Sequence, residues 1–437
     1  MKQILNRIGF IAFVCVVGSG WSQSLNEFVN AALENNYQIR IVKNEAQVAA
    51  NNNTPGNAGQ LPTIDFAGST STSLNNTLQA LADGSVREGS NAKNSNINAS
   101  LTANWTIFDG FRVQAKKQQL NILEQIGEQD AKFYIEQTVS DVVVAYHQLV
   151  YEQQLLNNYK QSMSISAYRL SLEKKRNEVG AGKAIEYGQA LVDYQSDSIR
   201  YLAQRNTIKS LEIELNRLLN SPLESELKVD ISEFSVIPFP NKDSLLDQVK
   251  QNNSQLSQLQ LAELLTETEL RIVKANRYPK IDLFAGYQFS NSFAEVGFIN
   301  SNRSYGPTIG ASISFNLYNG GKTILEIENS AVYQENAHLS KEQTNQNIDA
   351  EVLSLYYQYN SIQERILLAS SNVGAINQVY EIASEQLKRG AINGYDFRLT
   401  QLTLLNAQLA LMELQFTQKA VEINLNRLTG NVLEAYL

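Results

Sequence analysis

The chain offers few residues whose type and spacing could support catalysis. The segment Val179–Ala184 contains Gly182-Lys183 and so has a superficial likeness to a phosphate-binding loop. A nucleotide-binding loop needs a further upstream glycine and a hydroxyl residue after the lysine, where this chain has Ala184. His147 and His338 are far apart, and neither has a second histidine or a cysteine nearby. We therefore expect no enzyme activity, no cofactor and no metal site.

Composition and charge exclude further classes of protein. The chain has 437 residues, and 36 Lys and Arg against 44 Asp and Glu give a formal net charge of −8. Because nucleic-acid binding requires a basic surface, we expect no nucleic-acid partner. A single cysteine excludes a disulfide framework. None of the seven prolines lies in 63–221 or 308–437, and this indicates very long helices.

The first 22 residues have the pattern of a secretory signal peptide. Lys2 and Arg7 precede the apolar run Ile8–Val17, and small residues follow as far as Ser22. Elsewhere no apolar run approaches the ~18 residues of a membrane-spanning helix. We expect cleavage after Ser22 and export of the mature chain, which would then lack Cys15.

The remainder is an internal duplication. Leu-Pro-Thr-Ile-Asp around Pro62 returns as Tyr-Pro-Lys-Ile-Asp around Pro279, an offset of 217 residues. From Gly110 onward the offset is constant at 210, as in the Asn-Arg-Leu segments that begin at 216 and 426. A constant register is expected of long helices, because one inserted residue rotates a helix face by about 100°. We expect repeats at 23–220 and 243–437, joined by a linker at 221–242.

Each repeat begins with two segments of alternating apolar and polar residues. We expect strands at about 63–73, 96–108, 280–290 and 305–317, joined by polar loops over 74–95 and 291–304. Alternation over about ten residues is typical of transmembrane β-strands, although a half-buried sheet of a soluble protein gives the same pattern. In the membrane interpretation, the side chains that face lipid are Ile97, Leu101, Ala103, Trp105, Ile309, Ala311, Ile313 and Phe315.

Four strands cannot close a membrane barrel by themselves. The smallest such barrels have about eight strands, and open sheet edges are not tolerated in lipid. If these strands span a membrane, the chain must therefore associate. Two copies would supply eight strands and three copies twelve, and the strand count alone does not choose between them.

Long helical hairpins follow the strands. Gly110 to Gly180 and Gly320 to Gly390 each span 70 residues, roughly 105 Å of helix. Shorter returning segments follow each turn, and further short helical segments precede the strands. We infer hairpins with tips near 180 and 390, in which one long helix packs beside two shorter helices placed end to end.

This order of elements, with the Asp109-Gly110 and Asn319-Gly320 strand exits, resembles the TolC family of outer-membrane efflux proteins. The resemblance implies an α+β membrane protein and a homotrimer, whose four transmembrane β-strands per chain form a 12-stranded β-barrel in the outer membrane. The long antiparallel coiled helical hairpins would form a periplasmic α-barrel, with 221–242 in the belt around its middle. Implied partners are outer-membrane lipid, a periplasmic adaptor (membrane fusion) protein and an inner-membrane pump of RND or ABC type.

The implied function is an outer-membrane channel for efflux or type I secretion. The alternative is a periplasmic adaptor or stalk protein, which also uses a long coiled hairpin. An adaptor would have one hairpin and a lipoyl-like β-domain, whereas this chain has two hairpins and two strand pairs.

The hairpin tips resemble the gated periplasmic entrance of that family. The resemblance implies that Asp396 narrows the lumen and favours cations, while Leu399 stands where a second acidic residue would lie. Leu387 and Ile392 occupy the positions of a tyrosine and an arginine that latch the closed state in the family, so we expect that this latch is not carried over. Glu186 either pairs with Lys388 or Arg389 or belongs to a solvated charge cluster at a helix end. The expected entrance residues are Gly180, Glu186, Lys388, Arg389, Gly390, Asp396 and Leu399.

Overall fold

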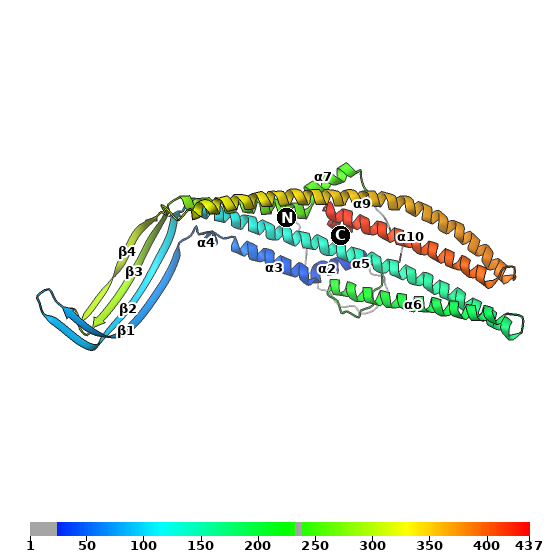
Figure 1. Ribbon diagram of the computed structural model, residues 1–437, viewed down its shortest axis with the longest axis horizontal. Coiled ribbons are helices and arrows are strands. Elements are labelled where there is room, and N and C mark those ends of the chain that lie inside the picture. Colours follow the sequence, from blue (N-terminus) through cyan, green and yellow to red (C-terminus); the bar gives the residue numbers. More distant parts are fainter. Residues whose placement is uncertain (1–23, 232–233, 235–237) are drawn as a thin grey trace. The chain divides into compact units, whose positions relative to one another are not determined.

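The computed structural model describes residues 24–231, 234 and 238–437 (Figure 1). The expected signal peptide lies outside the described residues. The chain divides into two compact units, and each takes segments from both sequence repeats. Unit 1 comprises Met1–Tyr37, Glu136–Leu245 and Leu353–Leu437, and unit 2 comprises Gln38–Ile135 and Leu246–Val352. The boundaries of the compact units therefore differ from those of the repeats at 23–220 and 243–437.

Unit 2 contains one antiparallel sheet with the strand order β1-β2-β3-β4. The central pair joins a strand of the first repeat to a strand of the second. Within the described chain, β1 and β4 are the sheet edges. The strands are β1 (Thr63–Ala80), β2 (Val86–Phe108), β3 (Lys280–Ala294) and β4 (Ser301–Ser314).

The first strand pair is longer than its sequence pattern suggested. β1 and β2 stay paired out to Ala80 and Val86, so most of the expected loop 74–95 is strand. Polar side chains support this extension, since the hydroxyl oxygens of Thr72 and Ser95 lie 3.1 Å apart. A strand pair with water on both faces needs no apolar face. The sequence of such a strand pair is therefore as polar as that of a loop. In the second pair, β3 and β4 likewise extend into 291–304, whereas β4 ends at Ser314 and leaves Phe315 beyond it.

Two helices of 67 residues dominate the helical part: α5 (Arg112–Glu178) and α9 (Lys322–Lys388), each about 100 Å long. Among the described helices, none has an apolar stretch long enough to cross a membrane. The others are α2 (Leu25–Asn35), α3 (Tyr37–Asn52), α4 (Pro55–Ala58), α6 (Ala184–Leu219), α7 (Lys242–Asn252), α8 (Ser254–Lys274), η1 (Ala275–Arg277), α10 (Gly394–Leu428) and α11 (Val432–Tyr436).

The duplication is visible in the backbone. Positive φ angles recur 210 residues apart at Gly110 and Gly320, and again at Asn220 and Gly430. The helix breaks at Asn36, between α2 and α3, and at Asn253, between α7 and α8, are 217 residues apart, the offset already seen for the two prolines. The repeat therefore conserves turns and breaks as well as sequence motifs.

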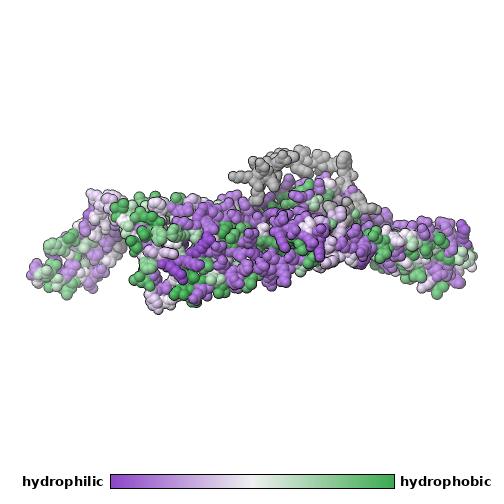
Figure 2. All heavy atoms as spheres, turned by 90° about the horizontal axis from the view of Figure 1, so that it is seen from above, coloured by the Kyte–Doolittle hydropathy of each residue, from purple (hydrophilic) through white to green (hydrophobic). Residues whose placement is uncertain are grey.

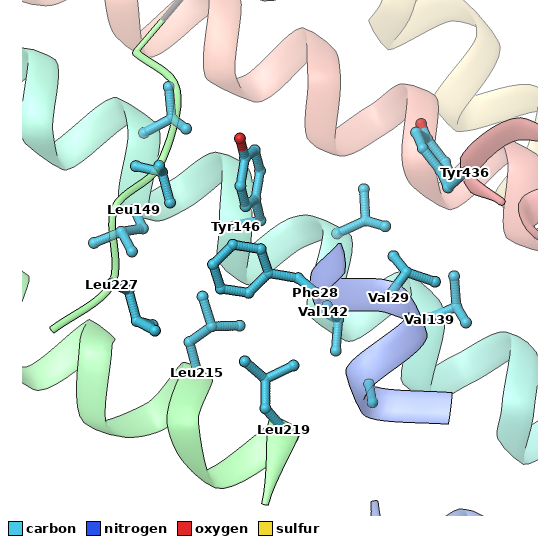
Figure 3. Packing of buried hydrophobic residues seen from close by; sticks show 14 of the residues in the cluster. Phe28, Val29, Val139, Val142, Tyr146, Leu149, Leu215, Leu219, Leu227 and Tyr436 are labelled. Atoms are coloured by element: carbon cyan, nitrogen blue, oxygen red, sulfur yellow. The ribbon is translucent and has the colours of Figure 1, made fainter. Parts of the chain in front are cut away.

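The largest apolar cluster lies in unit 1. Figure 3 shows Phe28 of α2, Tyr146 of α5 and Leu215 of α6 gathered together. The rings of Phe28 and Tyr146 meet edge to face, with centroids 5.3 Å apart. The Asn36 side chain donates to the Leu218 carbonyl at 2.8 Å, so the break between α2 and α3 is bonded to the end of α6. Leu227 of the linker joins the cluster, which anchors the chain between the repeats.

Candidate functional site

The two hairpin tips have the same turn. Gly180 and Gly390 have φ angles of 69° and 71°, a backbone conformation that favours glycine. Nothing lies within 4 Å of a Cβ added at either position, so backbone conformation rather than space requires glycine. The amide of Ala391 donates to the Gln386 carbonyl at 2.8 Å, which closes the turn after α9. The turns therefore lie where the sequence predicted them.

The exposed face of α10 at the second tip carries Asp396 and Leu399, two of the residues expected at the entrance. Tyr395 is 67% exposed, and Asp396 and Leu399 are exposed beside it. Asp396 also closes the start of the helix. Its backbone amide donates to the Asn393 side-chain oxygen, and the Asn393 side-chain nitrogen donates to the Asp396 carboxylate, both at 2.9 Å. The position of Asp396 is thus compatible with two roles: lining a passage and capping the start of α10.

The charged residues at the tips pair along their own helices. Lys183 lies 3.8 Å from Glu186, and Lys388 lies 2.7 Å from Glu385. Among the described ion pairs, none joins Glu186 to Lys388 or Arg389, and each of these two pairs joins residues three positions apart in the sequence. Exposed pairs of this kind contribute little to stability, because solvent screens them.

Leu387 and Ile392, the two positions at which we expected no polar latch, make apolar contacts. Leu387 is only 4% exposed and packs with Ala383 and Phe397. Ile392 lies against the same small cluster, together with Tyr380. Side-chain packing therefore links α9 to α10 here.

A buried ionic network in unit 1 connects the two hairpins. Asp197 of α6 is 1% exposed and accepts two parallel bonds from the Arg398 guanidinium of α10, at 2.7 and 2.8 Å. Ser162 of α5 donates to the same carboxylate at 3.2 Å, and Ser166 of α5 also donates to it. Burial alone would raise the pKa of Asp197, but the hydrogen bonds from Arg398 and the two serines outweigh burial and lower it.

A second carboxylate extends this network. Arg169 of α5 lies 2.7 Å from Asp193 of α6, and the Arg398 Nε lies 3.6 Å from the same carboxylate. The Gln401 side chain donates to the Ser162 carbonyl at 3.2 Å. Arg169 and Arg398 thus face two aspartates, and Arg200 of α6 adds a third guanidinium, which donates to Asp197 at 3.5 Å. We call Ser162, Ser166, Arg169, Asp193, Asp197, Arg398 and Gln401 the buried network.

The buried network was not predicted from the sequence. A signal was present, because Ser162 and Ser166 are four residues apart, as are Asp193 and Asp197, and that spacing places each pair on one helix face. The pattern does not reveal that these faces meet Arg398, which lies more than 200 residues from Asp193 and Asp197.

His147 contacts two aromatic rings in unit 1. It lies between the rings of Tyr146 and Phe234, with centroids 5.4 and 5.7 Å away. Its Nε2 has no hydrogen-bond partner within the described structure. Burial, together with the nearby charge of Lys419, lowers the pKa of His147 to about 3. The ring is therefore neutral at physiological pH, while His338 lies 2.9 Å from Glu263 on the surface of unit 2.

The strand register places seven of the eight expected lipid-facing residues on one face of the sheet, whereas Phe315 lies beyond the end of β4. Directly opposed residues of antiparallel strands share a face, so each register row crosses the whole sheet. Figure 2 shows hydrophobic residues at the surface of the sheet, and Ile309 is 85% exposed. The apolar rows are Ile64–Ala103–Ala285–Ile309, Phe66–Leu101–Tyr287–Pro307, Trp105–Leu283–Ala311 and Phe108–Ile281–Ile313.

The other face of the sheet is polar. A representative row is Asp65, Thr102, Gly286 and Thr308. Phe284 interrupts this polar face, and its ring lies over Gly310, where an added Cβ would come within 2.4 Å of it. The sheet therefore separates an apolar surface from a hydrophilic one.

Comparison with known proteins agrees with this architecture. A family model described as "Outer membrane efflux protein" matches residues 28–221 and 245–431. The chain is 20% identical over 429 residues, covering 96% of this chain and 86% of its relative, to the probable efflux pump outer membrane protein TtgC of Pseudomonas putida. The antibiotic efflux pump outer membrane protein ArpC of Pseudomonas putida matches with the same identity and coverage.

The fold is shared with a solved channel. The Campylobacter jejuni CmeC outer membrane channel superposes with a TM-score of 0.80 at 16% identity, covering 93% of this chain and 85% of that one. These findings support the channel interpretation over the adaptor alternative. Since the family model covers both repeats, this chain belongs to the outer membrane efflux protein family.

Proposed function

We propose that this protein is the outer-membrane channel of a tripartite efflux pump or type I secretion system. The observation that carries the proposal is the four-stranded sheet, which has one apolar face and two unpaired edges in the described chain. Open edges are not tolerated in lipid, so β4 of one copy must pair with β1 of the next. Three copies close a barrel of twelve strands, and the polar face then lines the passage.

The helical hairpins extend this passage through the periplasm. The mature chain is exported by its signal peptide, its sheet lies in the outer membrane, and its tips face an adaptor protein and an inner-membrane pump. Cargo, whether small molecules or proteins, passes from the tips to the exterior. Gly180, Glu186, Lys388, Arg389, Gly390, Asp396 and Leu399 surround the entrance.

The buried network holds the two hairpins together at this entrance. If the hairpins separate, Arg398 leaves Asp197, and the two hydrogen bonds between their side chains are lost. Contacts with the adaptor or pump must offset this loss when the entrance widens.

Fractionation and conductance test the proposed function. We expect the full-length protein in the outer-membrane fraction as an oligomer that resists detergent, and discrete conductance steps after its insertion into planar bilayers. Deletion of the gene should raise the intracellular level of a fluorescent pump substrate. Recovery as a soluble periplasmic protein, or the absence of conductance from intact oligomers, would contradict the proposal.

A further inference from the structure

The apolar face of the sheet ends at a definite row of the ladder. Its outermost apolar row is Gly68, Ala99, Phe289 and Tyr305. The next row on the same face is Thr70, Ile97, Asn291 and Arg303. Three of these four side chains are polar, and the row beyond it is Thr72, Ser95, Phe293 and Ser301. Polar residues replace apolar ones on β1, β2 and β4 within two rows, whereas β3 still carries the exposed Phe293.

The height of the apolar band fits a lipid bilayer. Ile281 and Phe289 mark its two ends on β3 and are eight residues apart. At about 3.3 Å per residue the band is about 26 Å long along the strand, and about 20 Å high at the usual barrel tilt. Outer-membrane barrels have apolar bands of about 25 Å. Ala285 lies midway between the two ends and therefore near the bilayer midplane.

Aromatic side chains mark both ends of the band. Phe289 and Tyr305 lie opposite each other on the outer row. At the other end the Trp105 indole donates to the Gln60 carbonyl at 3.0 Å, and the Phe108 ring meets a neighbouring ring edge to face. Tyrosine and tryptophan concentrate at membrane interfaces, because one part of each ring is apolar and the other polar. The aromatic side chains at the two ends of the band therefore mark two membrane interfaces.

Basic residues follow immediately outside the outer interface. Arg303 is exposed in the row next to Tyr305, and Lys93 is exposed on the same face four residues beyond Ile97. Within the described chain, neither side chain takes part in an ion pair. Arg87 differs, since its guanidinium donates to the Gly297 carbonyl at 2.5 Å and lies 6.0 Å from the centre of the Phe298 ring. Arg303 and Lys93 therefore have charged groups available to a ligand.

We propose that Arg303 binds a phosphate group of an outer-leaflet lipid, with Lys93 as a weaker second contact. This inference rests on the proposed function, because it requires the apolar band to lie in a membrane. A guanidinium is a planar fork that binds phosphate oxygens in pairs, whereas an ammonium acts as a point charge. The occupant is a lipid because the apolar band begins directly beneath Arg303 and accommodates acyl chains.

Binding of lipid A to the purified oligomer tests this assignment. We expect diphosphoryl lipid A to bind the Arg303→Gln variant about fivefold more weakly, and Arg303→Lys to recover part of the affinity. Arg205→Gln, which removes an exposed arginine of α6, serves as the matched control and should bind normally. Equal affinity of wild type and Arg303→Gln would overturn the inference, as would equal binding of dephosphorylated lipid A. Competition by inorganic phosphate at the concentration of the lipid would identify a general anion site and would also overturn it.

Depth measurements separate this inference from the proposed function. Fluorophores at Ala285→Cys and Asn291→Cys are compared in vesicles whose lipids carry bromine at different acyl positions. We expect deep bromines to quench the label at position 285, while the label at 291 responds to shallow quenchers. If Ala285 is not quenched, the membrane assignment fails with the proposed function. If Ala285 is deep while Arg303→Gln keeps full affinity for lipid A, only the phosphate site fails.

Discussion

Asp197 receives hydrogen bonds from three helices, and its enclosure makes single substitutions in the buried network costly. Arg398→Met leaves Asp197 buried without its main partner, so we expect a loss of about 3–5 kcal/mol in unfolding free energy. The double variant Arg398→Met, Asp197→Leu removes both charges and should be closer to wild type. Denaturant unfolding of the purified protein measures both variants. A loss below 1 kcal/mol in the single variant would show that the pair does not hold the hairpins.

His147 makes the folded state less stable as pH falls. A histidine whose protonated ring forms a salt bridge has the opposite effect. The pKa of His147 falls from 6.5 in the unfolded chain to about 3 in the fold, so the unfolded state binds the extra proton between these values. Stability should therefore decrease as pH falls below 6.5, by about 1.4 kcal/mol per unit from this group alone. We expect His147→Gln to flatten the acid limb of a plot of unfolding free energy against pH. An unchanged acid limb would contradict the assignment.

At the scale of elements, the sheet provides paired tests of its two faces. Ala103 and Ile309 lie on the middle row of the apolar band, and substitution of either by arginine should cost about 2–4 kcal/mol. Ile313→Arg, at the periplasmic end of the band, should cost about 0–1 kcal/mol. Thr102→Arg is the matched control for Ala103→Arg, because its side chain lies on the polar face. The temperature at which the oligomer dissociates in detergent reports the cost, and equal losses at positions 102 and 103 would rule out a membrane-facing band.

The elements differ in how far the sequence predicts them. The long helices follow from the missing prolines and the constant offset, and the strands from their alternation. The outer part of β1 was not predicted, because its Ser, Thr and Asn side chains carry no apolar face that would reveal a strand. The contact between Arg398 and Asp197 was not predicted either, since no local pattern states which helix faces meet across two repeats. Local periodicity determines each element, whereas tertiary packing determines the buried network.

At the scale of the whole molecule, the proposed threefold assembly would multiply the charge of Asp396. Three copies of an exposed carboxylate around one axis would attract cations, and a narrow passage screens them less than bulk water does. Asp396→Asn keeps the backbone amide that bonds to Asn393, so the helix start survives the change. We expect this variant to lose cation selectivity and to be blocked less by multivalent cations in planar-bilayer recordings.

Glu186→Gln is the matched control for Asp396→Asn, because it removes one carboxylate from the other tip. Glu186 lies 3.8 Å from Lys183 on its own helix, so its loss should leave both selectivity and open probability nearly unchanged. If instead Asp396→Asn oligomers keep wild-type selectivity, the constriction does not depend on this carboxylate. The exposed side chains of Tyr395 and Leu399 on the same face of α10 would then form an apolar gate, which Leu399→Ser should open to larger conductance.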